Sequence, residues 1–214
     1  MALISARTII TSLSLFHLTL AFFFLTNPAA VSDQAVVYLL GESMGLPHSR
    51  SFDAQSPSLA FLAVILGLFG LCDLVTLSLP DEICIVHHWG VQAPLRLTIS
   101  LLLSAYSFFL SPSSPFFYTS PKDFPPYTSD TRAPFAHPSV HHATHNPAYI
   151  PSGWGGDALK NRVFFTFMFV ETMGWFWALV TLREEQREIL EKKERQRQRR
   201  RSSGSGSGFG NFAR

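Results

Sequence analysis

The feature that most constrains this chain is the stretch 163–182, which has twenty residues and a single charge, Glu171. At about 1.5 Å per residue, a helix of this length covers about 30 Å, the thickness of the hydrocarbon core of a bilayer. An arginine stands just outside each end of the stretch, and two tryptophans lie in its second half. The stretch therefore predicts a helix that spans a membrane.

Three more apolar runs precede it, at residues 9–26, 59–79 and, after a short connecting loop expected over 80–94, at 95–110. Together they predict an all-α fold, an integral membrane four-helix bundle over residues 1–188. The segment 111–160 holds nine of the 14 prolines and has no sustained periodicity, so we expect a long irregular loop between the third and fourth spans.

The first run has a second interpretation, since Ala29 and Ala30 follow it as in a cleaved signal peptide. Two features favour an uncleaved span. The run has eighteen residues, which is long for a signal peptide, and His17 lies at its centre.

The distribution of charge predicts the membrane topology, that is, on which side each terminus and loop lies. Charged residues make up only 15% of the chain, against about 25% in soluble domains. The segment 183–201, directly after the last span, carries nine Lys/Arg against five Asp/Glu. The positive-inside rule places that end in the cytoplasm, and four spans then place both termini there and the loop 111–160 on the other side. Residues 189–214 are expected to form a basic and then Gly/Ser-rich tail, disordered over 202–210.

Small residues predict where the helices approach each other closely. Ala60, Ala63, Gly67 and Gly70 recur at steps of three and four, and so share one face of the second span. Four serines do the same in the third span, namely Ser100, Ser104, Ser107 and Ser111. Small residues on one face let two helix backbones associate in lipid.

Four ionisable residues fall inside the predicted spans, namely His17, Asp73, Arg96 and Glu171. Such groups are costly in lipid unless they are paired or protonated. We expect His17 and Glu171, at similar depth, to form a hydrogen-bonded pair, and Asp73 and Arg96 to form an ion pair. Two interpretations remain open: a proton or substrate relay, or structural pairing inside a packed bundle.

The loop contains a group of histidines, His137, His141, His142 and His145. The part HPSVHH matches one box of membrane di-iron desaturases and hydroxylases. Those enzymes need several such boxes on the cytoplasmic side, and this loop is predicted on the other side. We therefore predict no metal site, no catalytic residue and no cofactor.

The basic tail has two candidate roles. Its arginines could contact anionic lipid, or be read by a receptor as an arginine-type retrieval signal of the endoplasmic reticulum. The residues concerned are Arg195, Arg197, Arg199, Arg200 and Arg201. Binding of nucleic acid is not expected, because no aromatic residues are interleaved for stacking.

Four segments carry a resemblance to a known family. MALISARTIITSLSLFHLTLAFFFLT (1–26), LGESMGLPHSRSFD (40–53), WGVQAPLRL (89–97) and VETMGWFWALVTLREEQRE (170–188) resemble the family named "increased loss of mitochondrial DNA protein". The resemblance implies a small four-span protein of the endoplasmic reticulum membrane, required indirectly for the upkeep of mitochondrial DNA. It brings no catalytic residues.

Taken together, the sequence predicts a non-enzymatic multi-pass protein whose partners are the lipid bilayer and other membrane proteins. The alternative is a transporter or channel component with an intramembrane carboxylate relay. A metal-dependent membrane enzyme using the loop histidines is the third and least supported interpretation.

Overall fold

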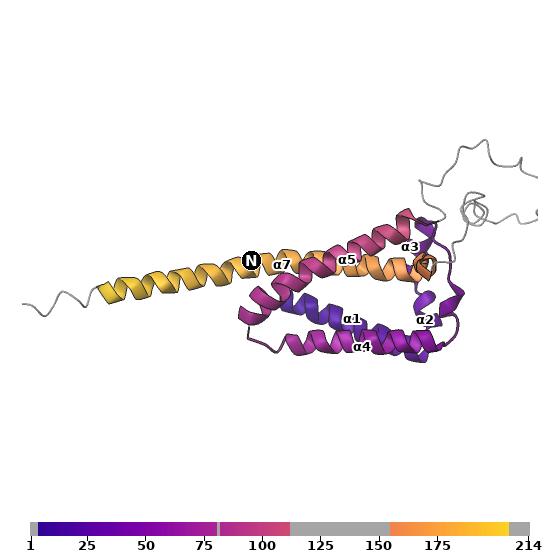
Figure 1. Cartoon of the computed structure of the whole chain (residues 1–214), viewed down its shortest axis with the longest axis horizontal. Helices are drawn as coiled ribbons and strands as arrows, with labels where there is room; N and C mark the ends of the chain where they lie inside the picture. Colours follow the sequence, from indigo (N-terminus) through magenta and orange to yellow (C-terminus); the bar gives the residue numbers. More distant parts are fainter. Residues whose placement is uncertain (1–3, 81, 112–154, 206–214) are drawn as a thin grey trace, which may run out of the picture.

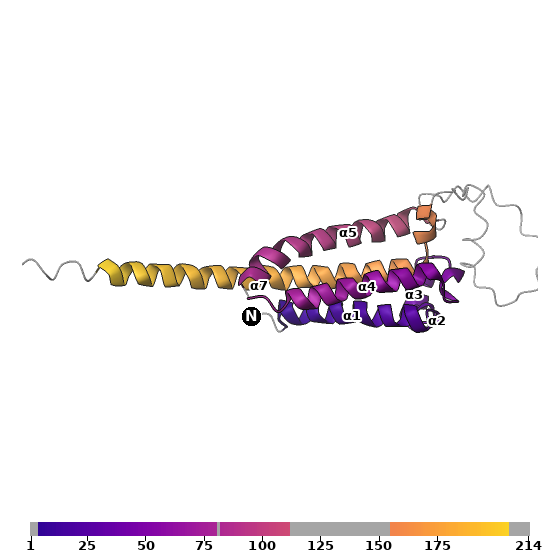
Figure 2. The ribbon, with the colours of Figure 1, turned by 60° about the horizontal axis from the view of Figure 1, so that its bottom comes forward.

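The computed structural model describes residues 4–80, 82–111 and 155–205, and this part of the chain is helical and contains no strand. Four long helices lie side by side (Figures 1 and 2). They are α1 (Ala6–Thr26), α4 (Pro57–Thr76), α5 (Trp89–Phe109) and α7 (Arg162–Ser205). Successive long helices run in opposite directions. Helix α1 packs on α4, α5 packs on α7, and α1 also contacts α7.

Polar side chains fix where these helices begin. Ser5 caps α1 by accepting a hydrogen bond from the Thr8 backbone N–H, and Ser56 caps α4 in the same way before Pro57. At the start of α7, Asn161 Oδ1 accepts from the Phe164 N–H at 2.9 Å. These side chains satisfy backbone donors that the first turn of a helix leaves unpaired.

The connection between α1 and α4 contains the short helices α2 (Ala29–Ser32) and α3 (Ala35–Ser43), and a 3-10 turn at Arg50–Phe52. Helix α3 packs on the first turns of α7. The short apolar run 35–40, too short to cross a membrane, thus contributes to the helix packing. Gly45, with φ of 64°, follows α3 in the left-handed conformation that suits glycine after a helix.

The connection 80–94, expected to be a short loop, is instead helical. A π-helical segment, η2 (Glu82–His88), leads directly into α5 at Trp89. The loop prediction was wrong because Cys84, Ile85 and Trp89 are buried in the core, and this burial outweighs the polar character of the neighbouring histidines. As a consequence Arg96 lies two turns inside α5, and not one residue inside its start.

Three of the four predicted spans are long and apolar enough to cross a membrane, namely Ala6–Thr26, Pro57–Thr76 and the helix of Arg162–Arg200. Helix α5 is not among them. It is as long as α1, but Gln92, Arg96 and three serines lower its mean hydropathy. The fourth crossing, and with it the four-helix membrane bundle, therefore remains a prediction.

The predicted small-residue faces lie where helices meet. A Cβ added to Gly70 would lie 2.9 Å from the backbone oxygen of Ser14 in α1. Ala63 is buried in the same face, whereas Ala60 is exposed. The four serines of the third run are all buried. One of them contacts η5 (Gly155–Leu159), because Ser107 Oγ donates to the Leu159 carbonyl at 3.2 Å.

Helix α7 continues without interruption for 44 residues, well past the other helices (Figure 1). Three contacts hold its extension in place. Glu185 Oε1 accepts the Ala6 N–H at 2.8 Å, Gln186 Nε2 donates to the Ile85 carbonyl at 2.9 Å, and Lys193 forms a salt bridge with Glu82. The helix includes Ser202–Ser205, which were expected to be disordered, and residues 206–214 lie outside the described part.

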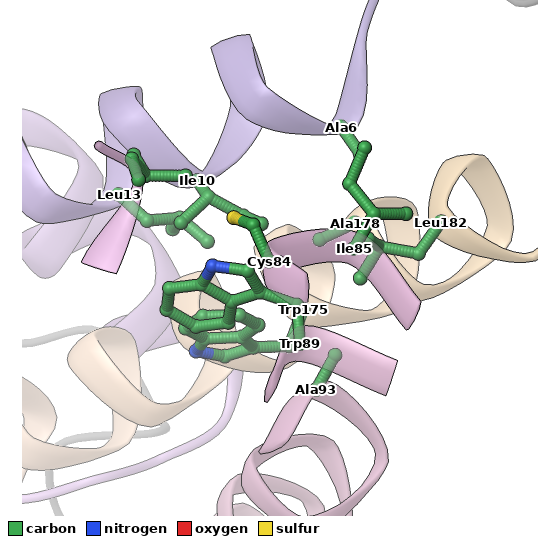
Figure 3. Packing of buried hydrophobic residues seen from close by; sticks show 11 residues of the cluster. Ala6, Ile10, Leu13, Cys84, Ile85, Trp89, Ala93, Trp175, Ala178 and Leu182 are labelled. Atoms are coloured by element: carbon green, nitrogen blue, oxygen red, sulfur yellow. The ribbon is translucent and has the colours of Figure 1, made fainter. Parts of the chain in front are cut away.

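The main core lies where α1 begins. Trp89 and Trp175 stack there with ring centroids 5.6 Å apart and an angle of 21° (Figure 3). Both are almost completely buried, among side chains from α1, η2 and α7. This pair joins α5 to α7 next to the predicted polar residues.

Candidate functional site

Five side chains from the four long helices form a continuous cluster, which we call the polar chain. Its members are His17 of α1, Glu171 and Trp175 of α7, Arg96 of α5 and Asp73 of α4. The sequence predicted four of the five. Trp175 was not recognised as a member, although its i,i+4 spacing from Glu171 places both on one helix face.

The structure brings His17 and Glu171 together. His17 Nε2 lies 2.7 Å from Glu171 Oε1, and the Trp175 indole N–H donates to the other carboxyl oxygen, Oε2, at 2.7 Å. His17 is 5% exposed and Glu171 7%. Both oxygens of a buried acid therefore have a partner, as burial demands. The second ring nitrogen of His17, Nδ1, has no partner in the described structure.

Asp73 and Arg96 also meet. The guanidinium donates two hydrogen bonds, Nη1 to Asp73 Oδ2 at 2.6 Å and Nη2 to Oδ1 at 2.7 Å. Asp73 is 3% exposed and lies in the last turn of α4. This parallel arrangement is the strongest form of a carboxylate–arginine contact, and it ties α4 to α5.

Trp175 connects the two pairs. The Arg96 guanidinium carbon lies 4.9 Å from the centre of the Trp175 ring and 5.4 Å from that of Trp89. A cation over an indole face is attracted by the electrons of the ring. Trp89 belongs to the segment that the sequence assigned to a loop, and for this reason its contribution was not foreseen.

The ionisable groups of the polar chain form two pairs, His17 with Glu171 and Asp73 with Arg96. Among the described residues no group of three or more His, Cys, Asp or Glu side chains is arranged to hold a metal ion. The loop histidines, His137, His141, His142 and His145, lie outside the described residues, so the structure does not bear on them.

The basic tail lies far from the polar chain, and the structure does not bring the arginines of the tail together with it. Four of the five predicted tail residues are exposed near the far end of α7, namely Arg195, Arg197, Arg199 and Arg200. The side chain of the fifth, Arg201, is not described. They follow Trp175 by twenty or more residues along the same helix, so the tail is a feature separate from the polar chain.

Closer to the core, the extension of α7 carries an ion pair that the sequence did not predict. The hydrogen bond from Lys193 lowers the pKa of Glu82 below its ordinary value. Glu82 opens η2, in the segment assigned to a loop, so no sequence pattern placed it beside α7.

Comparison with known proteins gives one match. The sequence profile of the family described as increased loss of mitochondrial DNA protein 1 matches residues 4–192. No curated protein and no solved structure matches the chain. Because the profile covers most of the chain, the protein belongs to this family.

Proposed function

We propose that this member of the increased loss of mitochondrial DNA protein 1 family is a non-enzymatic multi-pass protein of the endoplasmic reticulum membrane. It supports maintenance of mitochondrial DNA indirectly, through contacts with lipid or with other membrane proteins. The observation that carries this proposal is the polar chain. Each of the four predicted intramembrane ionisable groups contacts a partner on another long helix, which is the arrangement of a structural clamp.

The positions of the helix ends support four crossings. Helix α7 begins beside the connection that follows α3, since the Arg162 N–H donates to the Pro47 carbonyl. Its apolar part ends beside the start of α1, where Glu185 accepts from Ala6. Helix α4 ends on that same side, near Arg7, whose guanidinium donates to Leu79. In the proposed arrangement the chain returns across the membrane between α4 and α7, through α5.

The charges that follow α7 support the orientation. With four crossings and nine basic residues in 183–201, both termini face the cytoplasm. The arginines of the tail then stand where an arginine-type retrieval signal is read, which favours the endoplasmic reticulum.

Replacement of the tail arginines by glutamine tests this location. A tagged protein that moves to later compartments would support it, and unchanged localisation would count against it. The residues to replace together are Arg195, Arg197, Arg199, Arg200 and Arg201.

The test of the clamp is Glu171→Gln in cells that lack their own family member. We expect the protein level to fall and mitochondrial DNA to be lost in proportion, because the amide disturbs the bonds to His17 and Trp175. Glu184→Gln, at an exposed position on the same helix, is the matched control and should leave both unchanged.

The transporter alternative rests on the buried His17–Glu171 pair, near the middle of α1 and of the apolar stretch 163–182 of α7. It predicts the opposite result, a normal protein level with lost function, and loss of ion flux in proteoliposomes. The Trp175 indole, which follows Glu171 in the polar chain, is not a group that exchanges protons at ordinary pH, and this favours the clamp.

A further inference from the structure

A cavity of about 400 Å³ lies between α1, α2, α3 and α7, at the end where α7 begins. This volume falls within the roughly 300–1,000 Å³ in which proteins hold small ligands. The wall is mainly apolar and includes Phe16, Leu20, Phe24, Val37, Val163 and Phe167. The cavity belongs neither to the polar chain nor to the basic tail.

One hydroxyl on the cavity wall has no partner. Thr166 is 6% exposed, and its Oγ1 makes no hydrogen bond in the described structure. The other buried threonines of α7 differ, since Thr172 Oγ1 donates to the Met168 carbonyl at 2.7 Å and Thr181 also bonds back to its own helix. Burial of an unpaired hydroxyl is costly, so the Thr166 hydroxyl indicates a ligand that forms a hydrogen bond with it.

A cation lies one turn before this hydroxyl. Arg162 and Thr166 are four residues apart and so share one side of α7. The Arg162 guanidinium carbon lies 5.6 Å from the centre of the Tyr38 ring, and its Nε is buried without a hydrogen-bond partner in the described structure. Gly41 makes room for it, because a Cβ there would lie 2.5 Å from the Arg162 Cβ.

We propose that this cavity binds a glycerophospholipid of the non-cytoplasmic leaflet. Its acyl chain fills the apolar cavity. Thr166 Oγ1, closed off from the cavity in the structure, turns about χ1 to donate a hydrogen bond to an ester carbonyl, and the phosphate faces Arg162, which lies beyond the cavity wall at the start of α7. Along α7 the cation comes first, then the hydroxyl and then the apolar wall. This order matches that of the phosphate, the ester and the acyl chain in the lipid. The inference rests on the membrane placement proposed above, in which acyl chains surround α1 and α7.

The test uses the full chain in mild detergent with dioleoyl phosphatidylcholine added, and native mass spectrometry counts the retained lipid. We expect one lipid per protein. Thr166→Val replaces the hydroxyl with a methyl group of similar size, and Arg162→Gln removes the charge. Each should lower the retained fraction by about fivefold to tenfold, the effect of one lost hydrogen bond. Thr172→Val is the matched control and should retain the lipid, because Thr172 bonds its own helix.

A variant that fills the cavity keeps the test decisive if Arg162→Gln fails to fold. Ala30 lines the cavity from α2, and Ala30→Phe should give a helical protein that excludes the lipid. Retention by that variant, equal loss from Thr166→Val and Thr172→Val, or equal binding of oleate, which has no ester, would each overturn the site. Release of the wild-type protein from membranes by alkaline carbonate would instead refute the membrane placement.

Discussion

Trp175 lies one turn after Glu171 on α7 and donates its indole N–H to Oε2 of that carboxyl at 2.7 Å. The same indole ring stacks on Trp89 and lies under the Arg96 guanidinium. One side chain thus satisfies a buried acid and also carries the contact between α7 and α5.

Trp175→Phe tests this double role. The change keeps an aromatic ring and leaves Glu171 Oε2 without its donor, so we expect a loss of about 1–3 kcal/mol in the free energy of unfolding. Thermal and denaturant unfolding in mild detergent measure it. Trp177→Phe is the control, because Trp177 is 55% exposed and should change stability by less than about 0.5 kcal/mol. Equal effects of the two changes would show that the indole bond contributes nothing.

The Asp73–Arg96 pair calls for a double-mutant cycle. Arg96→Gln leaves the buried Asp73 carboxylate without its partner, which typically costs about 3–5 kcal/mol, and Asp73→Asn leaves the part-buried Arg96 guanidinium unpaired at a smaller cost. The double variant should be less destabilised than the sum of the two, by a coupling of about 0.5–3 kcal/mol. Additive losses would mean that the two side chains act independently.

The contact between α1 and α4 should depend more on Gly70 than on Gly67, one turn earlier in α4. In Gly70→Ala the new Cβ would lie 2.9 Å from the Ser14 carbonyl oxygen, which is backbone and cannot rotate away. We expect a loss of about 1–3 kcal/mol. In Gly67→Ala the nearest atom is the Ala21 Cβ at 3.6 Å, an ordinary contact, so this control should be neutral or up to about 1 kcal/mol more stable. Unfolding of both variants in detergent gives the comparison.

The salt bridge between Lys193 and Glu82 predicts a dependence on pH. Its hydrogen bond lowers the pKa of Glu82 from 4.5, so the contact contributes stability above that pH and loses it as the pH falls through the lowered value. The protection of the α7 backbone amides around Lys193, measured as the exchange rate relative to the intrinsic rate at each pH, should therefore fall in acid.

Two substitutions make the assignment. Lys193→Gln should return the pKa of Glu82 towards 4.5, as followed by carboxyl NMR, and should speed exchange already at neutral pH. Lys192→Gln is the control, since Lys192 pairs with Glu188 at 3.8 Å and not with Glu82. A Glu82 pKa that ignores the change at position 193 would contradict the contact.

Much of the polar chain could be predicted from sequence, because an ionisable group in an apolar helix needs a partner at its own depth. That argument alone brought together His17 with Glu171 and Asp73 with Arg96. The same argument did not identify Trp89 or Trp175, because an indole is not an ionisable group. Trp89 was hidden in a segment whose neighbouring histidines and prolines suggested a loop, and only packing against α7 shows that it is buried.

The cavity could not be predicted, because its walls come from four helices whose relative placement no local pattern states. Thr166 illustrates the limit. In the sequence it is one more hydroxyl in an apolar helix, and only the structure separates it from Thr172, whose hydroxyl bonds the preceding turn.

The unbroken course of α7 sets how far the arginines stand from the bilayer. From Leu182 to Arg195 and Arg200 the helix rises about 20 and 27 Å, beyond headgroups only about 5–8 Å deep. Electrostatic attraction in the cytosol decays over about 8 Å. In the proposed membrane placement these guanidinium groups therefore stand beyond the range of the headgroups around α7, and they face the cytosol.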